Sequence, residues 1–336
     1  MRAEQFHACK MFGSVAFWLL SAAPAAAANI IELGMPIDCE IGRNCVIQNY
    51  VDHGLSSDAQ DYQCGGLTYR GHDGTDFRLP TLAAQHAGVS VRAAAHGQVL
   101  RMRDGIPDQL ISAADRSSVA DRECGNGVVI SHDDGWETQY CHLMKDSVAV
   151  KRGDWVSAGQ PLGRVGLSGL TEFPHLHLTV RHRGEIIDPF AFGALKNSCG
   201  SGTLLWSAGL GNSLIYRERT VLNVGFSPAP VTMGQIESGE TGRDQEWVNA
   251  EALVAFVRSV GLKAGDVQQI AIRAPDGQIF AAHTDAVLDR NKAQSMVFVG
   301  KKRPPSGWTR GSYQASYRVT HDGRPVLEKV FELSVE

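Results

Sequence analysis

Short runs of β-branched and apolar residues, separated by Gly, Asp and Pro, dominate residues 66–197. Residues 128–130 and 138–140 flank the turn signal Asp133-Asp134-Gly135, which predicts a β-hairpin. A further strand is predicted at residues 176–181, where apolar and polar positions alternate. This part of the chain is therefore predicted to be mostly β.

Two segments between these strands have a different pattern. Residues 102–123 are polar and are predicted to form a loop-like insertion. Residues 150–163 contain spaced glycines and a proline, which favour tight turns between short strands.

The pattern changes after the Gly/Ser-rich residues 197–202, where we predict a domain boundary. Alternating strands are predicted at 269–273, 295–299 and 313–319, with turn signals between them. This spacing is typical of an immunoglobulin-like β-sandwich over residues 203–336. Residues 252–260 fit either a short helix or a buried strand, and His283 and His321 are interpreted as bystanders.

The N-terminus has the features of a secretory signal peptide over residues 1–28. Arg2 and Lys10 precede an apolar run too short to span a bilayer comfortably, and small residues follow, which predicts cleavage near Ala27 or Ala28. An uncleaved N-terminal anchor or a disordered leader is the alternative. We expect an exported protein, first of all periplasmic and otherwise extracellular or associated with the cell envelope, without a transmembrane segment in its mature chain.

After loss of Cys9, six cysteines remain for three disulfides in an oxidising compartment: Cys39, Cys45, Cys64, Cys124, Cys141 and Cys199. Cys124 and Cys141 flank the predicted hairpin, so they are expected to face each other. The other pairings stay open, with Cys39–Cys45 and Cys64–Cys199 as one arrangement. Residues 29–65 are interpreted as a disulfide-bearing N-terminal segment.

Charge and length narrow the function further. The chain has 336 residues, 43% of them hydrophobic, which is enough for two globular domains. The formal net charge of −4 gives no basic excess, so nucleic acid is excluded as an expected partner.

The candidate chemistry begins with His72 and Asp76, which lie in the glycine-containing sequence G-H-D-G-T-D. Imidazole and carboxylate are suitable zinc donors. Gly71, Gly74 and Thr75 disfavour a helix here, so we predict a turn that enters a strand. Alone, this motif is more often structural.

A second motif places His175 and His177 on one face of the strand predicted at 176–181, with Leu176 and Leu178 on the other face. One histidine can bind a metal while the other reaches a neighbouring water or oxyanion. A third candidate is His142, which ends the strand that carries Thr138 and Tyr140 and is expected to share their face.

Together, G-H-D-G-T-D, Q-Y-C-H-L and P-H-L-H-L-T-V resemble, in this order, the motifs of the lysostaphin-type peptidoglycan metalloendopeptidases. The run G-Q-P-L-G-R-V-G fits as well, and the resemblance covers residues 66–190. It implies an antiparallel β-sheet metallopeptidase domain over residues 66–197. Cys141 stands where this family usually has a small residue such as Ala, and the polar insertion before Gly125 is a second departure.

The resemblance implies one zinc ion per chain, held by His72, Asp76 and His177 with water in the fourth position. His142 and His175 would then be the catalytic pair. One would accept a proton from water, and the other would stabilise the oxyanion or donate to the leaving amine. No H-E-x-x-H motif supplies a glutamate base.

The substrate that the resemblance implies is peptidoglycan, cut either at glycine-rich bridges or at D-amino-acid crosslinks of the stem peptides. Tyr69, Arg70 and Trp136 are candidates for lining the groove, although aromatic residues near a hairpin are more often packed. The second domain is interpreted as a substrate-positioning, wall-binding or regulatory-partner module, or as structural support.

Two other functions fit parts of the pattern. One is a noncatalytic wall-binding or hydrolase-activating protein with the same fold, although all the ligand positions are intact. The other is a biotinyl or lipoyl carrier, because residues 150–163 resemble a strand-turn carrier pattern; the absence of a lysine hairpin opposes it. Occlusion of the site by residues 102–123 is a further hypothesis.

Overall fold

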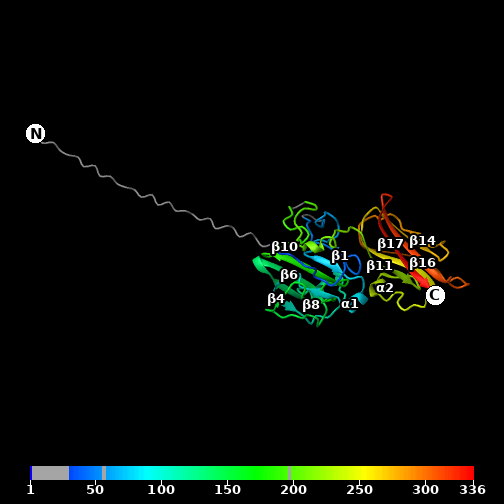
Figure 1. The fold of residues 1–336 in the computed structure, drawn as a ribbon, viewed down its shortest axis with the longest axis horizontal. Coiled ribbons are helices and arrows are strands. Elements are labelled where there is room, and N and C mark those ends of the chain that lie inside the picture. Colours follow the sequence, from blue (N-terminus) through cyan, green and yellow to red (C-terminus); the bar gives the residue numbers. More distant parts are fainter. Residues whose placement is uncertain (2–29, 55–57, 196–197) are drawn as a thin grey trace.

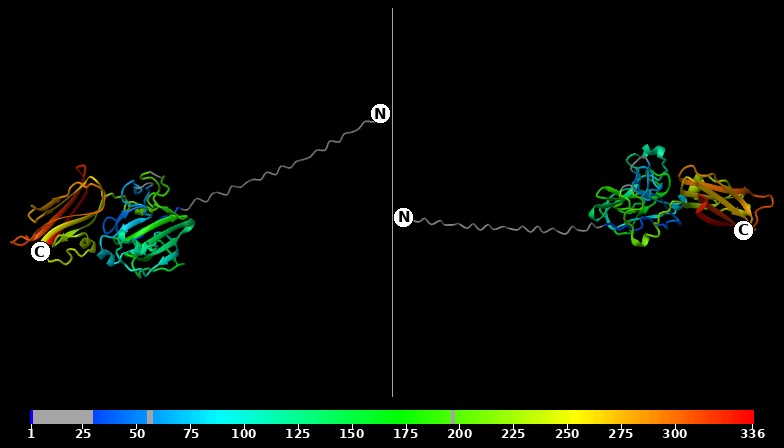
Figure 2. Two further views of the ribbon diagram at one scale, coloured as in Figure 1. Left: turned by 180° about the vertical axis from the view of Figure 1, so that it is seen from behind. Right: turned by 90° about the horizontal axis from the view of Figure 1, so that it is seen from above.

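Two β-structured units lie side by side in the computed structural model, which describes residue 1 and residues 30–54, 58–195 and 198–336. Figure 1 shows the first unit in blue to green and the second in yellow to red, and the two further views of Figure 2 show the same arrangement. The predicted signal peptide lies outside the described residues, apart from residue 1.

The first unit is an eight-stranded antiparallel sheet. Seven of its strands follow the order β1-β2-β9-β6-β5-β4-β7, and the eighth, β10, pairs with residues 180–182 of β9, beyond the residues that pair with β2. A separate two-stranded sheet pairs β3 with β8. The elements are β1 (Val46–Asn49), β2 (Thr75–Arg78), α1 (Leu82–His86), β3 (Ser90–Arg92), β4 (Gly97–Arg103), η1 (Ala113–Val119), β5 (Asn126–Ser131), η2 (Asp133–Gly135), β6 (Trp136–Leu143), β7 (Trp155–Val156), β8 (Pro161–Arg164), β9 (His175–His182) and β10 (Glu185–Ile187).

The predicted hairpin is confirmed, because β5 and β6 pair in antiparallel fashion across η2. The insertion starts later than predicted, since β4 continues through Met102 and Arg103 before the chain leaves the sheet. Beyond that point the insertion contains one short 3₁₀ helix, η1.

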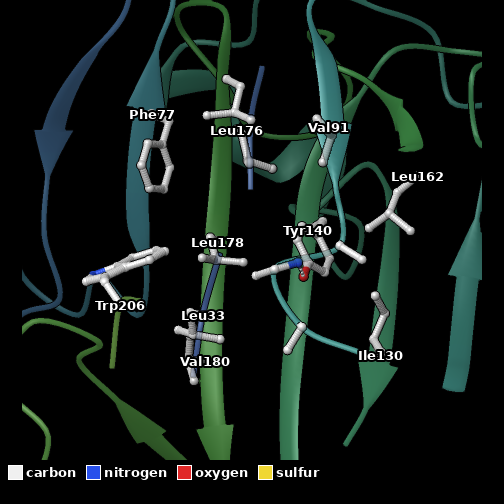
Figure 3. Packing of buried hydrophobic residues seen from close by; sticks show 14 of the residues in the cluster. Leu33, Phe77, Val91, Ile130, Tyr140, Leu162, Leu176, Leu178, Val180 and Trp206 are labelled. Carbon is white, nitrogen blue, oxygen red and sulfur yellow. Dashed lines mark hydrogen bonds between the residues drawn. The ribbon is translucent and has the colours of Figure 1, made fainter. Parts of the chain in front are cut away.

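The core lies on one face of this sheet. Leu176, Leu178 and Val180 of β9 are at most 1% exposed and pack with Phe77 and Tyr140 from the two flanking strands, as Figure 3 shows. Burial of these alternating side chains fixes the register, because a slip by one residue would expose them all. Asp76 and His177, which alternate with these core residues along β2 and β9, are therefore held on the opposite face.

The second unit is a β-sandwich with a three-stranded sheet, β11-β12-β15, and a four-stranded sheet, β14-β13-β16-β17. Its elements, with the connecting helices, are η3 (Ala208–Leu210), β11 (Thr220–Ser227), α2 (Met233–Ser238), η4 (Trp247–Asn249), β12 (Ala252–Leu262), β13 (Asp266–Arg273), β14 (Ile279–Thr284), β15 (Lys292–Lys302), β16 (Gly311–His321) and β17 (Arg324–Val335). Seven antiparallel strands in two sheets agree with the predicted immunoglobulin-like class. Residues 252–260 are part of a strand buried along its whole length, β12.

The predicted division at residue 203 does not coincide with the division between the two cores. Leu205, Trp206 and Leu214 pack in the core of the first unit, and Leu33 pairs with Trp206. The core of the second unit begins with Phe226. Tyr216 packs against this first core as well, so we propose that the boundary falls after Tyr216 rather than at the Gly/Ser-rich segment.

Three disulfides stabilise the first unit: Cys39–Cys45, Cys64–Cys199 and Cys124–Cys141. The Cys124–Cys141 pairing predicted from the hairpin is confirmed. Cys64–Cys199 fastens the segment after β10 back to the N-terminal segment. Among the described residues, no helix has the length and apolar character needed to cross a bilayer.

Candidate metal centre

His72 and Asp76 lie where a loop enters β2, as the glycine pattern predicted. His72 precedes the strand and Asp76 is its second residue, and both side chains are at most 3% exposed. Gly74 lies between them against β9, where a Cβ atom would come within 2.6 Å of His177 Nε2. A glycine at this position lets the loop approach β9 closely enough for the two segments to share a site.

His177 completes a tight group of three donor atoms, because Asp76 and His177 are directly paired across β2 and β9. His72 Nε2 is 3.2 Å from Asp76 Oδ1 and 3.2 Å from His177 Nδ1. Asp76 Oδ1 is 2.9 Å from His177 Nδ1. Tetrahedral zinc with bonds of about 2.0–2.1 Å requires donor separations of about 3.3 Å, so these three atoms fit one face of its coordination shell.

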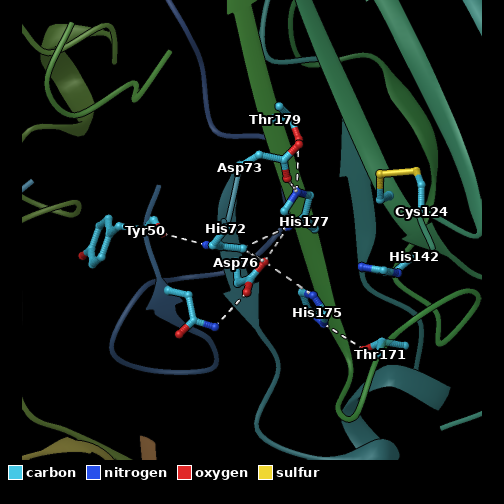
Figure 4. A network of polar contacts seen from close by, with 12 residues as sticks. Tyr50, His72, Asp73, Asp76, Cys124, His142, Thr171, His175, His177 and Thr179 are labelled. Carbon is cyan, nitrogen blue, oxygen red and sulfur yellow. Dashed lines mark hydrogen bonds and ion pairs between the residues drawn. A yellow bond between two sulfur atoms is a disulfide. The ribbon is translucent and has the colours of Figure 1, made fainter. Parts of the chain in front are cut away.

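Hydrogen bonds on the outer side of the group decide which imidazole nitrogens face inward (Figure 4). His72 Nδ1 lies 2.7 Å from the Tyr50 carbonyl oxygen and donates to it, which leaves the Nε2 lone pair free. His177 Nε2 lies 3.1 Å from an Asp73 carboxylate oxygen, so donation to Asp73 frees Nδ1. The lone pairs of His72 Nε2 and His177 Nδ1 then converge with the Asp76 carboxylate oxygen, with no hydrogen between them. A bound cation would stabilise this arrangement.

The electrostatics of the group agree with cation binding. Burial opposes ionisation of Asp76, but the neighbouring histidines outweigh it and hold the pKa of this carboxyl well below its ordinary value. Burial also lowers the pKa of His177, but its hydrogen bonds to Asp73 and Asp76 raise the pKa to about 9. Without a metal, the anionic carboxylate therefore keeps a proton on His177, and a metal ion would take the place of that positive charge.

His142 also lies at this site, but on a different face of the sheet from the one that strand alternation predicted. Thr138 and Tyr140 face the core, whereas the ring of His142 lies 4.6 Å from that of His175 and 6.0 Å from that of His177. The expectation that His142 shares their face is therefore wrong. Its φ of 62° ends the strand alternation and turns the side chain to the other face of the sheet.

Two hydrogen bonds to backbone carbonyl groups hold His142 in this unusual conformation. Its N–H donates to the Cys124 carbonyl at 2.8 Å, and its Nδ1 lies 2.8 Å from the Ser168 carbonyl oxygen. Burial lowers the pKa of His142 well below its ordinary value, and the nearby His175 and His177 lower it further. The ring is therefore neutral at pH 7, with Nε2 as a free acceptor.

His175 is arranged in the same manner on the first residue of β9. Its Nδ1 lies 2.9 Å from the Phe173 carbonyl oxygen and 3.1 Å from Thr171 Oγ1, and its Nε2 lies 3.5 Å from Asp76 Oδ1. Burial lowers the pKa of His175 as well, although Asp76 opposes the shift. Two neutral imidazoles thus lie beside the three donors, where they can exchange protons with a bound water or a leaving group.

Of the three residues predicted to line the groove, Trp136 does not. It is 2% exposed and stacks on His182 at the far end of β9, with a centroid distance of 4.2 Å. Tyr69 is 55% exposed and its ring lies 4.5 Å from that of His72, so it borders the site. Arg70 is exposed next to it in the same loop.

Sequence reasoning missed Asp73 and the carbonyl groups that orient the histidines. Asp73 lies inside the G-H-D-G-T-D motif, so its position beside His72 was a usable signal. The carbonyls of Tyr50, Phe173 and Ser168 are backbone groups, and no residue type marks them in a sequence.

The insertion is fastened to the loops beside the two neutral histidines. Asp108 accepts hydrogen bonds from the backbone N–H groups of Lys145 and Leu167, at 2.9 and 2.5 Å. The Ile111 N–H donates to the Thr171 carbonyl at 2.8 Å. The insertion therefore forms part of the rim of the site, and its role in occlusion stays a prediction.

An antiparallel β domain with a His–Asp–His donor group and two adjacent neutral imidazoles has the site of a metal-dependent hydrolase. Residues 70–189 match the model of Peptidase family M23. The chain therefore carries an M23 metallopeptidase domain, as the lysostaphin-type resemblance predicted.

Two curated relatives each match about a third of this chain. Peptidoglycan DD-endopeptidase ShyA of Vibrio cholerae serotype O1 is 32% identical over 117 residues, which are 35% of this chain and 22% of that protein. DD-carboxypeptidase/endopeptidase Mpg of Neisseria meningitidis serogroup B is 33% identical over 123 residues, or 36% of this chain and 23% of that protein. The chain thus spans less than a quarter of the length of these relatives.

Among solved structures, a zinc-containing peptidase from Vibrio cholerae aligns with 26% identity. The alignment covers 46% of this chain and 41% of that chain, with a TM-score of 0.29.

Proposed function

We propose that this protein is an exported zinc metalloendopeptidase that hydrolyses peptide bonds in the crosslinks or stem peptides of bacterial peptidoglycan. The observation that carries the proposal is the triangle of donor atoms from His72, Asp76 and His177, with sides of 2.9–3.2 Å. The name of one curated relative, peptidoglycan DD-endopeptidase ShyA, supports the choice of peptidoglycan. Three disulfides support an oxidising compartment, and we propose the periplasm.

In this proposal the three donors hold one zinc ion and leave a fourth position open. When bound, zinc supplies Lewis acidity and makes a water molecule nucleophilic near neutral pH. Two imidazoles and one carboxylate form a donor set that suits zinc. Asp73 keeps the His177 ring in the required tautomer by accepting the Nε2 hydrogen.

The chain's own contribution to the chemistry comes from His142 and His175. Both rings have a hydrogen-bonded Nδ1 and an Nε2 directed away from that bond, so Nε2 is the atom that accepts or donates the proton in transit. One imidazole accepts the proton of the attacking water, and the other stabilises the oxyanion and supplies a proton to the leaving amine. Burial of both rings keeps bulk water away from these steps.

The test is the release of muropeptides. Purified diaminopimelate-type peptidoglycan is incubated with the zinc-loaded protein, and the products are identified by mass spectrometry. We expect loss of crosslinked muropeptides with the wild type and none with His142→Ala or after chelation. Zinc-loaded wild type that leaves the crosslinks intact would contradict the proposal and favour the noncatalytic alternative.

A further inference from the structure

A hollow of about 310 Å³ lies on the sheet of the first unit, lined by residues of β4, β5 and β6 and by Cys124 and Gly125. Two cationic residues and one disulfide-bonded cysteine are part of its lining, which includes Arg101, Arg103, Cys124, Gly127, Val129 and Gln139. The catalytic chemistry described above uses neither arginine.

The strand register places this hollow on the same face as His177. Thr179 is paired with Gln139, Gln139 with Val129, and Val129 with Arg101. Directly paired residues share a face of the sheet, and Thr179 is two residues from His177 on β9. The face that carries the metal donors therefore continues across β6 and β5 to the arginines of β4.

The two guanidinium groups have no acidic partner in the part of the chain that the structure describes. Arg103 donates through Nε to the Gly125 carbonyl at 2.8 Å, which fixes its side chain beside the hollow. Arg101 is exposed, and none of its donors is paired among the described residues. The chain as a whole carries a formal net charge of −4. These two arginines without an acidic partner are therefore a local feature and not part of a generally basic surface.

We propose that this hollow is a subsite for a carboxylate of the peptide substrate, held by Arg101 and Arg103. The inference rests on the proposed peptidase function and narrows its substrate class. A guanidinium group presents a planar set of donors that matches a carboxylate in bidentate geometry. Gly127 and Val129 present no polar side chain to the hollow, and the Gln139 amide is already hydrogen-bonded to Arg181 and Cys141, so the arginines are the groups that select its occupant.

The distance fits a short peptide. Three strand spacings of about 4.8 Å separate β9 from β4, or about 14 Å in all. An extended peptide advances about 3.3 Å per residue, so the subsite corresponds to a residue two to four positions from the bond cleaved, once the inward reach of the arginine is included. An acidic stem peptide carries carboxylates at such distances, whereas a glycine bridge carries none. The subsite therefore selects stem-peptide crosslinks over glycine bridges.

Binding of two synthetic stem peptides of equal length tests this inference. One has free side-chain and α-carboxylates, and the other has carboxamides in their place. Both are titrated calorimetrically into the zinc-loaded full chain with the His142→Ala substitution, which prevents turnover during the measurement. We expect the carboxylate peptide to bind about tenfold more tightly or better, since charge-assisted bidentate hydrogen bonds are the stronger kind. Adding Arg101→Ala should bring the two affinities close together, and Arg101→Lys should keep part of the difference.

The control is Arg290→Ala, which removes an exposed arginine of the second unit and should leave the preference intact. Equal affinity for the two peptides, or a preference that survives Arg101→Ala, would overturn the subsite. If crosslinks are cleaved but no carboxylate preference exists, the subsite alone fails. If the preference exists but zinc-loaded wild type cleaves nothing, the proposed peptidase function fails while the carboxylate site stands.

Discussion

The guanidinium group of Arg78, two residues after Asp76 on β2, donates to the Glu237 carboxylate at the end of α2 with a distance of 2.8 Å. Arg258 of β12 donates to the same carboxylate and to the Pro80 carbonyl. Arg78 also lies over the Phe173 ring, 4.2 Å from its centroid, and the Phe173 carbonyl orients His175. The second unit is thus joined to the segment that carries the candidate catalytic histidine.

Glu237→Ala should destabilise the protein by about 3 kcal/mol or more, because it leaves two buried cations without their shared anion. The measurement is the free energy of unfolding by urea. Glu240→Ala is the matched control, since the exposed Glu240–Arg243 pair should contribute less than about 1 kcal/mol. Similar small effects from both substitutions would show that the contact between the units is weak.

Asp73→Asn should weaken zinc binding by about tenfold to a hundredfold, since a carboxylate that accepts from a metal-bound histidine has an effect of this size. Competition with a chromogenic chelator measures the affinity. Asp134→Asn removes a carboxylate that pairs with the exposed Arg183 and serves as the control. Unchanged zinc affinity in Asp73→Asn would mean that Asp73 does not orient His177.

Removal of the Cys124–Cys141 disulfide should affect both stability and activity. The bond closes a loop with a sequence separation of 17, so the double substitution to Ala should lower the free energy of unfolding by about 3 kcal/mol. Peptidase activity should fall more than the folded fraction does, because the disulfide fixes the position of Cys124, whose backbone carbonyl accepts the hydrogen bond from the His142 N–H that holds His142 at positive φ. Activity that follows the folded fraction in the double variant would contradict this link to His142.

The His53–Asp188 contact predicts a pH-dependent stability. The hydrogen bond that His53 Nε2 donates to the Asp188 carboxylate, at 2.8 Å, raises the pKa of His53 above its unfolded value of about 6.5. Its stabilising effect is therefore complete below pH ~6.5 and is lost as the pH rises through the folded-state pKa. His53→Ala and Asp188→Asn should each flatten the fall in unfolding free energy across that window. An unchanged pH slope in both variants would contradict the assignment.

The local sequence was sufficient to predict the hairpin and the alternation of β9, because each rests on a short-range signal, a turn or a period of two. The three candidate metal donors were implied by the family resemblance, and the structure brings them together in one group. The position of His142 could not be predicted in this way. Strand alternation places it with Tyr140 in the core, and only the positive φ, held by a carbonyl from the distant Cys124, brings it to the site.

Longer-range contacts explain the other differences. Trp136 is of a residue type that often lines grooves, but it packs on His182 and Phe192, which lie far from it in the sequence. The Gly/Ser-rich stretch looked like a linker, yet Cys199 is bonded to Cys64, and the residues after it complete the first core. No local pattern indicates a contact of this length.

The metal content of the purified protein tests the central claim most directly. Metal content is measured after dialysis by inductively coupled plasma mass spectrometry. We expect about one zinc per chain in the wild type and in His142→Ala, and loss of the metal in Asp76→Ala. This result would show that zinc binding requires the donor Asp76 and does not require the neighbouring imidazole of His142. Wild type without bound zinc, or zinc retained in Asp76→Ala, would contradict the assignment of the metal centre.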